Sequence, residues 1–241
     1  MSDWDGKAYD ALPLPHQQWG LRTIEALNLN EYDTVLDAGC GTGRDAAIAL
    51  ESLTSGNLIC LDQSPGMLKQ CSERLGPDPR VQIVEASLDS PFPIPAESVD
   101  AVMSVAALHW LPNHLNVWRN IFEVLKSGGR IAIDAGGAGN LDHTLELARQ
   151  IDPDISFPHW YYADIKSTED LLNQAGFVNC EVSLRKHPTT LPDNSTMQEY
   201  LKTLVFREWT QTQIEAISKL MIDNTIAVSY THLTLPTIYS V

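Results

Sequence analysis

The sequence has few positive charges, and this shortage excludes one class of partner. Its 241 residues include 16 Lys and Arg against 31 Asp and Glu, which gives a formal net charge of −15. A protein that binds a phosphate backbone needs clustered Lys and Arg side chains. We therefore expect neither DNA nor RNA as a partner.

A long apolar run and a regular cysteine pattern are also lacking. No stretch approaches the roughly 18 apolar residues that span a bilayer, and the acidic start MSDWDGKAYD lacks the basic and apolar regions of a signal peptide. The four cysteines form no CxxC pair, so the sequence predicts neither a zinc site nor a disulfide framework. We expect reduced thiols, no bound metal, no membrane partner and a cytoplasmic location.

The chain does contain a regular alternation of strand-like and helix-like segments. Apolar runs predict strands over residues 34–38, 57–62, 81–86, 99–106, 130–135 and 177–187. Amphipathic or capped segments predict helices over residues 16–28, 44–53, 64–75, 116–129, 167–176, 195–207 and 211–224. Strands that alternate with helices indicate a doubly wound α/β fold with a mostly parallel sheet. We find no repeat and no low-complexity linker, and therefore expect a single domain.

Residues 34–44, TVLDAGCGTGR, join the first predicted strand to its helix through three glycines. Gly39, Gly41 and Gly43 permit a tight turn and let backbone N–H groups approach a ligand closely. Asp62 ends the second strand, where a carboxylate can bind the two hydroxyls of a ribose. A glycine turn with a distal acid is typical of a site for a nucleoside-containing cofactor.

Two residues distinguish between the possible cofactors. A dinucleotide-binding turn has the form GxGxxG, and Arg44 stands where its third glycine would be. Asp37, beside the turn, would repel a pyrophosphate but suits a ligand with an ammonium group. The pattern counts against NAD, although an NAD-dependent oxidoreductase stays open as an alternative.

At this point the chain resembles the class I S-adenosylmethionine-dependent methyltransferases, whose first motif is typically (V/I)LD(L/A)GCGTG. The resemblance covers about residues 34–135, through Asp62, SVDAVMSVAALHWLPN and LKSGGRIAI. The LHWLPN segment, an N-terminal Tyr-Asp and HQQWG are most similar to the trans-aconitate methyltransferase-like branch. The resemblance implies a Rossmann-like sheet, S-adenosylmethionine as cofactor, and methylation of a small molecule. We expect an O-methylated carboxylate or hydroxyl, and a monomer or homodimer.

The resemblance also implies roles for single residues. Asp37 would meet the α-amino group of the cofactor, Asp62 its ribose hydroxyls, and Gln63 and Met67 would flank the adenine. Ser87 stands where many relatives carry an aspartate for the adenine, and this departure keeps a catalytically silent cofactor binder as an alternative. The full expected cofactor set is Asp37, Gly39, Cys40, Gly41, Gly43, Asp62, Gln63, Met67, Ser87, Leu88 and Ser104.

His109 follows the fourth predicted strand, at the place where the methyl group should point. It is the candidate catalytic residue, because it can position the acceptor or accept a proton. The alternative is that His109 and Trp110 only form a wall of the pocket. The expected substrate set is Tyr9, Trp19, His109, Trp110 and Trp160.

We expect one methyltransferase domain over residues 1–228. It divides into an N-terminal lid and helix (1–30), a cofactor-binding core (31–135), and substrate-side helices with a sixth strand (136–228). The tail 229–241, SYTHLTLPTIYSV, looks non-native, and Pro236 argues against a central strand. We therefore expect the last, antiparallel strand of this fold to be missing or replaced, with a genuine β-rich tail as the alternative.

Overall fold

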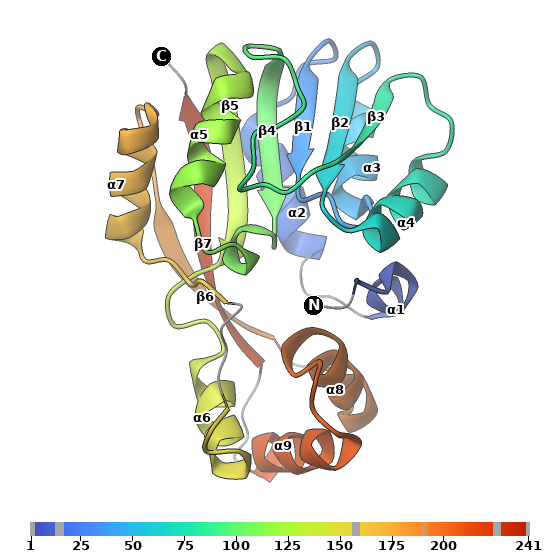
Figure 1. Cartoon of the computed structure of the whole chain (residues 1–241), viewed down its shortest axis with the longest axis vertical. Helices are drawn as coiled ribbons and strands as arrows, with labels where there is room; N and C mark the ends of the chain where they lie inside the picture. Colours follow the sequence, from blue (N-terminus) through green and yellow to red (C-terminus); the bar gives the residue numbers. More distant parts are fainter. Residues whose placement is uncertain (1–2, 13–16, 156–159, 190, 224–227, 240–241) are drawn as a thin grey trace.

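The computed structural model describes residues 3–12, 17–155, 160–189, 191–223 and 228–239. A seven-stranded sheet has the strand order β3-β2-β1-β4-β5-β7-β6 (Figure 1). Strands β1 to β5 are parallel, and β7 is antiparallel to both of its neighbours. This confirms the predicted Rossmann-like α/β fold. The strands are Thr34–Ala38 (β1), Asn57–Asp62 (β2), Val81–Glu85 (β3), Val99–Val105 (β4), Leu125–Gly136 (β5), Ser183–Thr189 (β6) and Val228–Tyr239 (β7).

Helices cover both faces of the sheet. Helices α2 (Gln17–Leu27), α3 (Arg44–Ser52) and α4 (Pro65–Leu75) pack side by side on one face, and α5 (His114–Val124) and α7 (Ile165–Ala175) pack on the other. Successive residues of a strand point to opposite faces. Apolar residues on both faces of β1 therefore enter two separate core clusters, one beneath each helical layer.

A second group of helices lies beyond the carboxyl edge of the sheet (Figure 1). This helical cap consists of α6 (Asp142–Ile151), α8 (Asn194–Tyr200) and α9 (Gln211–Asp223), and a wider helical turn, Leu201–Val205, follows α8. Buried apolar side chains of the cap form a third cluster together with Leu12 and with Trp19 of α2. The short helix α1 (Gly6–Ala11) packs against α4 and lies between α4 and α8 in Figure 1.

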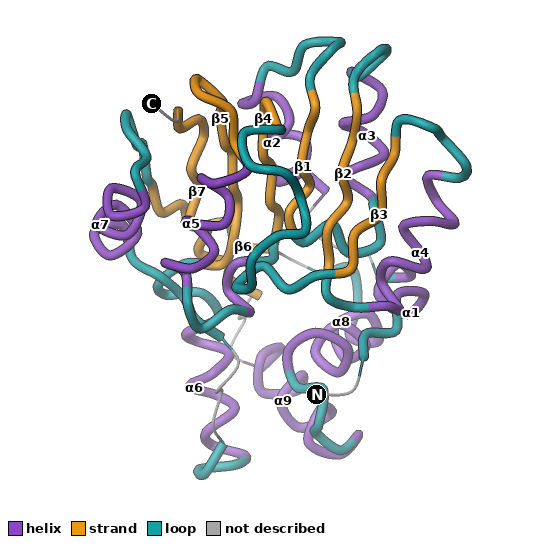
Figure 2. Tube along the Cα trace, turned by 45° about the horizontal axis from the view of Figure 1, so that its top comes forward, coloured by secondary structure: helices purple, strands orange, loops and turns teal. Residues whose placement is uncertain are grey.

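The chain order reverses beside β1, which pairs with β2 on one side and β4 on the other. In a sheet of this type, the crevice at the carboxyl ends of these strands is where ligands bind. Figure 2 shows the loops after β1, β2 and β4 gathered at this edge, facing the helical cap and α1. The glycine turn that follows β1 is one of these loops.

The last strand was expected to be missing or replaced. It is present, so its absence is ruled out, whereas the non-native character of the tail 229–241 stays a prediction. Strand β7 lies between β5 and β6, pairs with both, and buries Leu233 in the core. Pro236 is tolerated because the pairing with β6 ends at Thr234, so the strand beyond that point has a partner on one side only. A register shift between Ile131 and Ile133 of β5 accommodates the extra residue.

Several boundaries also differ from the prediction. Helix α1 was not expected, and α5 ends at Val124 because β5 already begins at Leu125. Helix α7 begins at Ile165, capped by Asp164, whose carboxylate accepts the N–H of Ser167. Residues 13–16 of the expected lid and residues 156–159 of the expected pocket wall lie outside the described residues.

Candidate functional site

A cavity of about 600 Å³ opens at the carboxyl edge of the sheet. Its walls come from the N-terminal segment, the glycine turn, the ends of β2 and β4, the chain after β5, and the helical cap. A volume of this size is typical of a small-molecule site. The expected site residues that line it are Tyr9, Trp19, Gly39, Gly41, Asp62, Gln63, Met67, Leu88, His109, Trp110 and Trp160.

The glycine turn forms the floor at one end of the cavity. The N–H groups of Gly39 and Cys40 both donate to the carbonyl of Leu61, at 2.7 and 3.0 Å, which fixes the turn to the end of β2. Gly39 and Gly41 have positive φ angles of 84° and 52°. A Cβ on Gly41 would meet nothing within 4 Å. The turn therefore presents a bare backbone surface that a ligand can cover.

The carboxylate of Asp62 lies directly beside this floor. Its Oδ2 accepts the N–H of Gly41 and its Oδ1 accepts the N–H of Ser64, each at 2.9 Å. Burial raises the pKa of Asp62, and the backbone hydrogen bonds oppose this shift. Each carboxylate oxygen has a second lone pair, so Asp62 can still accept hydrogen bonds from two ligand hydroxyls.

Asp37 lines a narrow side crevice that shares Tyr9, Gly39 and Gly41 with the main cavity. Its side chain is 2% exposed, and its Oδ2 has no hydrogen-bond partner among the described residues. Burial raises the pKa of Asp37 well above its usual range, and the nearby Asp45 raises it further. A buried carboxylate in this situation is stabilised by a positive charge. The crevice therefore suits a cationic group of a ligand.

The N-terminal strap, residues 3–12, closes over the same end of the cavity. Asp3 accepts the hydroxyl of Ser64 at 2.6 Å and the N–H of Gly66 at 2.9 Å, which joins the strap to the start of α4. A Cβ on Gly66 would lie 2.3 Å from the carbonyl oxygen of Trp4, so glycine is needed for this close approach. The strap thus forms part of the wall rather than a free terminus.

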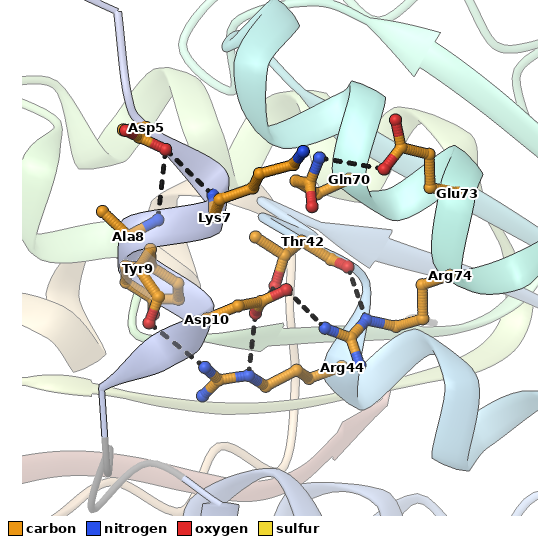
Figure 3. A network of polar contacts seen from close by, with 10 residues as sticks. All are labelled: Asp5, Lys7, Ala8, Tyr9, Asp10, Thr42, Arg44, Gln70, Glu73 and Arg74. Carbon is orange, nitrogen blue, oxygen red and sulfur yellow. Dashed lines mark hydrogen bonds and ion pairs between the residues drawn. The ribbon is translucent and has the colours of Figure 1, made fainter.

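Asp10 holds the other end of the strap (Figure 3). Its Oδ1 accepts hydrogen bonds from the Thr42 hydroxyl at 2.6 Å and the Arg44 Nε at 3.1 Å. Its Oδ2 forms an ion pair with Arg74 at 2.6 Å. The same Arg74 donates from Nε to the carbonyl of Thr42 at 2.9 Å. One carboxylate therefore connects the strap to the glycine turn, α3 and α4.

Aromatic rings form the opposite end of the cavity. The ring centroids of Trp4 and Trp110 are 5.3 Å apart, and those of Trp110 and Trp160 are 6.3 Å apart. Trp160 stacks on Tyr162 with 5.9 Å between centroids and an interplanar angle of 25°. His109 lies 5.9 Å from Tyr162. This end of the cavity, the acceptor end below, is predominantly apolar.

His109 has one ring nitrogen engaged by the backbone. Its Nδ1 accepts the N–H of Gly136 at 3.1 Å. A nitrogen that accepts a hydrogen bond carries no proton, so the proton of the neutral ring is on Nε2. The backbone of His109 is also held, because the N–H of Tyr161 donates to the His109 carbonyl at 2.9 Å. In this tautomer Nε2 is a hydrogen-bond donor.

Some expected cofactor residues do not line the cavity. The hydroxyl of Ser87 donates to Asp89 at 2.7 Å, and that of Ser104 donates to the carbonyl of Ala38 at 2.6 Å, which ties β4 to β1. Gly43 begins α3 and packs against Cys71. Cys40 lines only the side crevice.

The fold also brings together three cysteines that are far apart in the sequence. Cys40, Cys60 and Cys71 are buried beneath the glycine turn, with their sulfur atoms within 4.8 Å of one another. Hydrogen bonds from the other two thiols lower the pKa of Cys71 to about 4. The sequence did not predict this cluster, because the three cysteines are not joined by a short spacing such as CxxC.

Other wall residues were missed because nothing in the sequence places them at this edge. The start of the chain was expected to form part of a lid, but Asp3 and Trp4, which line the cavity, were not expected as site residues. The helix over 195–207 was predicted, but its pattern does not say which part of the sheet it covers. The missed wall residues include Asp3, Trp4, Asn140, Leu141, Tyr200, Leu204 and Val205.

Comparison with known proteins places this site in context. Residues 36–133 match the profile of a methyltransferase domain family. Trans-aconitate 2-methyltransferase of Escherichia coli strain K12 is 24% identical over 227 residues, which cover 92% of this chain and 86% of the relative. The enzyme of the same name from Shigella flexneri is 23% identical over the same shares of the two chains.

Solved structures share the fold. Phosphoethanolamine N-methyltransferase 2 of Haemonchus contortus, in complex with S-adenosyl-L-methionine, is 17% identical with a TM-score of 0.67, over 98% of this chain and 56% of that one. A geranyl diphosphate methyltransferase in complex with S-adenosylmethionine is 14% identical with a TM-score of 0.60, over 93% of this chain and 85% of the other. Within the described ranges, no helix combines the length and apolar character that a membrane span needs.

Proposed function

The chain is a class I S-adenosylmethionine-dependent methyltransferase, and we propose that it transfers the methyl group to an oxygen atom of a small molecule bound at the acceptor end of the cavity. This assignment sets aside the two alternatives considered above, an NAD-dependent oxidoreductase and a silent cofactor binder. The proposal concerns which residues hold the cofactor and which kind of atom receives the methyl group.

S-adenosylmethionine fits the glycine-turn end of the cavity. In our proposal Asp62 accepts the ribose hydroxyls, Gly41 leaves room for the ligand above its backbone, and Gln63 and Met67 flank the adenine. The observation that carries this placement is the unpartnered, buried carboxylate oxygen of Asp37. The α-ammonium group of the cofactor would supply the positive charge that this oxygen lacks.

The protein contributes mainly alignment and the exclusion of water. When bound, the cofactor would supply a methyl group on a positively charged sulfur, which an acceptor oxygen can attack as the S–C bond breaks and its electron pair returns to sulfur. A hydroxyl acceptor would react as its anion, after its proton has passed to solvent. Holding the two reacting atoms in line accounts for a barrier reduction on the order of 7–11 kcal/mol. The N-terminal strap and the aromatic wall line the cavity, and in our proposal they limit the access of water to the reacting atoms.

His109 acts in this proposal as a positioning donor rather than as a general base. Its Nδ1 already accepts the N–H of Gly136, so its remaining ring nitrogen is a donor and not a proton acceptor. An N–H donor at the acceptor end suits an oxygen atom with free lone pairs. This supports transfer to oxygen.

The proposal is tested with S-adenosylmethionine labelled in its methyl group. The purified protein is incubated with the labelled cofactor and a panel of phenols, enols, carboxylic acids and amines, and the products are analysed by mass spectrometry. We expect label on oxygen, with none in the Asp62→Ala variant. Label only on amine nitrogen would contradict transfer to oxygen, and full activity of the Asp62→Ala variant would contradict the cofactor placement.

A further inference from the structure

The acceptor end of the cavity lacks the charge that a polycarboxylate would need. Among the described residues, no Lys or Arg side chain lines the cavity. The ranges left undescribed contribute none either, because all 16 Lys and Arg of the sequence fall within the described residues. In this structure, therefore, no lysine or arginine of the chain is placed to pair with an acceptor bound there.

The cations that come near the cavity are engaged elsewhere. Arg44 and Arg74 pair with Asp10 on the strap. The guanidinium carbon of Arg207 lies 4.0 Å from the ring centroid of Trp4, a cation–π contact against the wall rather than inside it. The positive charges of these three arginines therefore interact with other groups of the protein.

The charges that do line the cavity are negative. Asp3 and Asp62 are on its wall. The adjoining crevice at the glycine-turn end is lined by Asp37 and Asp45 and also by Arg44, which is paired with Asp10. Among the described residues that line the cavity, His109 is the one other side chain that could carry a positive charge. Its Nδ1 accepts an N–H, which requires the neutral form of the ring. Among the described residues, no Lys or Arg at the acceptor end would pair with a ligand that carries several carboxylates. Its charges would be buried among carboxylates and aromatic rings, which is strongly unfavourable.

We infer that the acceptor is a largely apolar, planar molecule with no more than one ionisable oxygen, and that di- and tricarboxylates are poor ligands. This inference rests on the proposed function, and it departs from what the names of the most similar curated relatives would suggest. The stacked pair Trp160 and Tyr162 offers ring surfaces for a flat ligand. A single negative charge is still tolerated, because the sulfur of the bound cofactor carries one positive charge.

Calorimetry with a matched series of ligands tests the inference. The probes are 2-naphthol, 2-naphthoate, naphthalene-2,6-dicarboxylate and trans-aconitate, each titrated into the protein saturated with S-adenosylhomocysteine and into the cofactor-free protein. We expect 2-naphthol to bind at least tenfold more tightly than the last two, with 2-naphthoate in between, because the sulfur of S-adenosylhomocysteine lacks the positive charge that would pair with one carboxylate. Equal or tighter binding of the dicarboxylate or of trans-aconitate would overturn the inference.

A charge-insertion variant provides the converse test. Trp160 is a half-buried wall residue outside the glycine-turn end, so Trp160→Arg adds a cation and Trp160→Leu is the matched neutral control. We expect Trp160→Arg to bind naphthalene-2,6-dicarboxylate at least tenfold more tightly than Trp160→Leu does. Unchanged binding of S-adenosylhomocysteine by both variants reports that they are folded, and equal dicarboxylate binding by the two would count against the inference.

Failure of the inference and failure of the proposed function give different results. If S-adenosylhomocysteine does not bind, the cofactor placement is wrong, and the ligand series in the cofactor-free protein still decides the question of charge. If S-adenosylhomocysteine binds and trans-aconitate is the favoured ligand and becomes methylated, the proposed function stands and the inference about the acceptor is wrong.

Discussion

At one end of the cavity the wall consists of backbone amides and carboxylates, whereas at the other end it consists of aromatic rings. The glycine-turn end is formed by Gly39, Gly41 and Asp62 from two neighbouring strand ends, with Asp37 in the crevice beside it. The acceptor end is assembled from Trp4, the 108–111 turn, the chain after β5 and the helical cap. The first end offers fixed partners for a polar, cationic molecule, and the second offers shape and apolar surface.

The two ends of the cavity also differ in the electrostatic free energy that is needed to bury their side chains. At the glycine-turn end, burial raises the pKa of Asp37 and of Asp62, and it raises the pKa of Asp45 to about 6. These acids are held close together before a ligand arrives, which is unfavourable for the empty protein. The acceptor end carries no comparable cost. Substitutions at the glycine-turn end should therefore change cofactor binding and stability, whereas substitutions at the acceptor end should change turnover.

The largest effect is expected for Asp62→Ala. This substitution removes a carboxylate that accepts hydrogen bonds at the glycine turn and leaves the N–H groups of Gly41 and Ser64 without that partner. Losing charge-assisted hydrogen bonds to the cofactor should weaken binding of S-adenosylhomocysteine on the order of 100-fold, measured by calorimetry. Asp89→Ala is the control, because Asp89 bonds to Ser87 away from the cavity. If both variants bound S-adenosylhomocysteine with equal affinity, Asp62 would not be a cofactor-binding residue.

Asp37→Asn should have opposite effects on binding and on stability. The neutral amide cannot pair with an ammonium group, so we expect cofactor affinity to fall roughly tenfold or more. The cofactor-free variant should be more stable than the wild type by about 1 kcal/mol or more near neutral pH, because the cost of a buried charge is gone. Thermal unfolding with and without S-adenosylhomocysteine measures both effects.

The pH dependence of this difference follows from the raised pKa of Asp37. An acid whose pKa is higher in the folded state destabilises that state once the pH exceeds the ordinary value near 4, and the full penalty is reached above the raised pKa. The stability gap between Asp37→Asn and the wild type should therefore widen as pH rises and vanish in acid. A gap that stayed constant from pH 4 to pH 8 would refute the assignment of charge to this residue.

His109→Asn should affect the acceptor end alone. The side-chain oxygen of asparagine can still accept the N–H of Gly136, so the variant keeps that contact and removes the Nε2–H donor together with the ring contacts to Trp110 and Tyr162. We expect kcat to fall roughly tenfold, as for the loss of one hydrogen bond, with unchanged affinity for S-adenosylhomocysteine. The acidic limb of the rate–pH profile should be the same in both proteins. Loss of that limb in the variant would show that His109 acts as a base.

The smallest effect is expected for Asp10→Asn. It weakens partly exposed ion pairs with Arg44 and Arg74, each worth about 0.5–1 kcal/mol, so the cofactor should dissociate roughly three- to tenfold faster. Stopped-flow displacement of S-adenosylhomocysteine measures this rate. Asp78→Asn, which removes an ion pair with Arg80 far from the strap, should leave the rate unchanged. A rate that does not change in Asp10→Asn would show that the strap is held by other contacts.

The glycine-turn end could be predicted from sequence because its parts are local. A strand, three glycines and a following helix are consecutive, and Asp62 comes at the end of the next strand. The geometry of these parts follows from backbone conformation, which is encoded residue by residue. Asp37, Gly41 and Asp62 accordingly lie where the motif predicted, on the cavity or its side crevice.

The acceptor end could be predicted only in part because its residues meet through tertiary packing. Trp110 and Trp160 were expected on its wall, but Trp4, Tyr200 and Leu204 depend on where the strap and the helical cap pack. Strand β7 was missed for a related reason, since the rule against proline in a central strand assumes neighbours on both sides. At Pro236 the strand has one neighbouring strand. This depends on the register between the strands, which the local sequence pattern does not reveal.

The strap also has a consequence for the order of events in turnover. Asp3 is bonded at the start of α4, Trp4 contacts the ring of Trp110, and Asp10 is held over the glycine turn. A single segment of ten residues therefore contacts both ends of the cavity. A displacement of this segment would expose the cofactor end and the acceptor end together, so release of the two products would be linked.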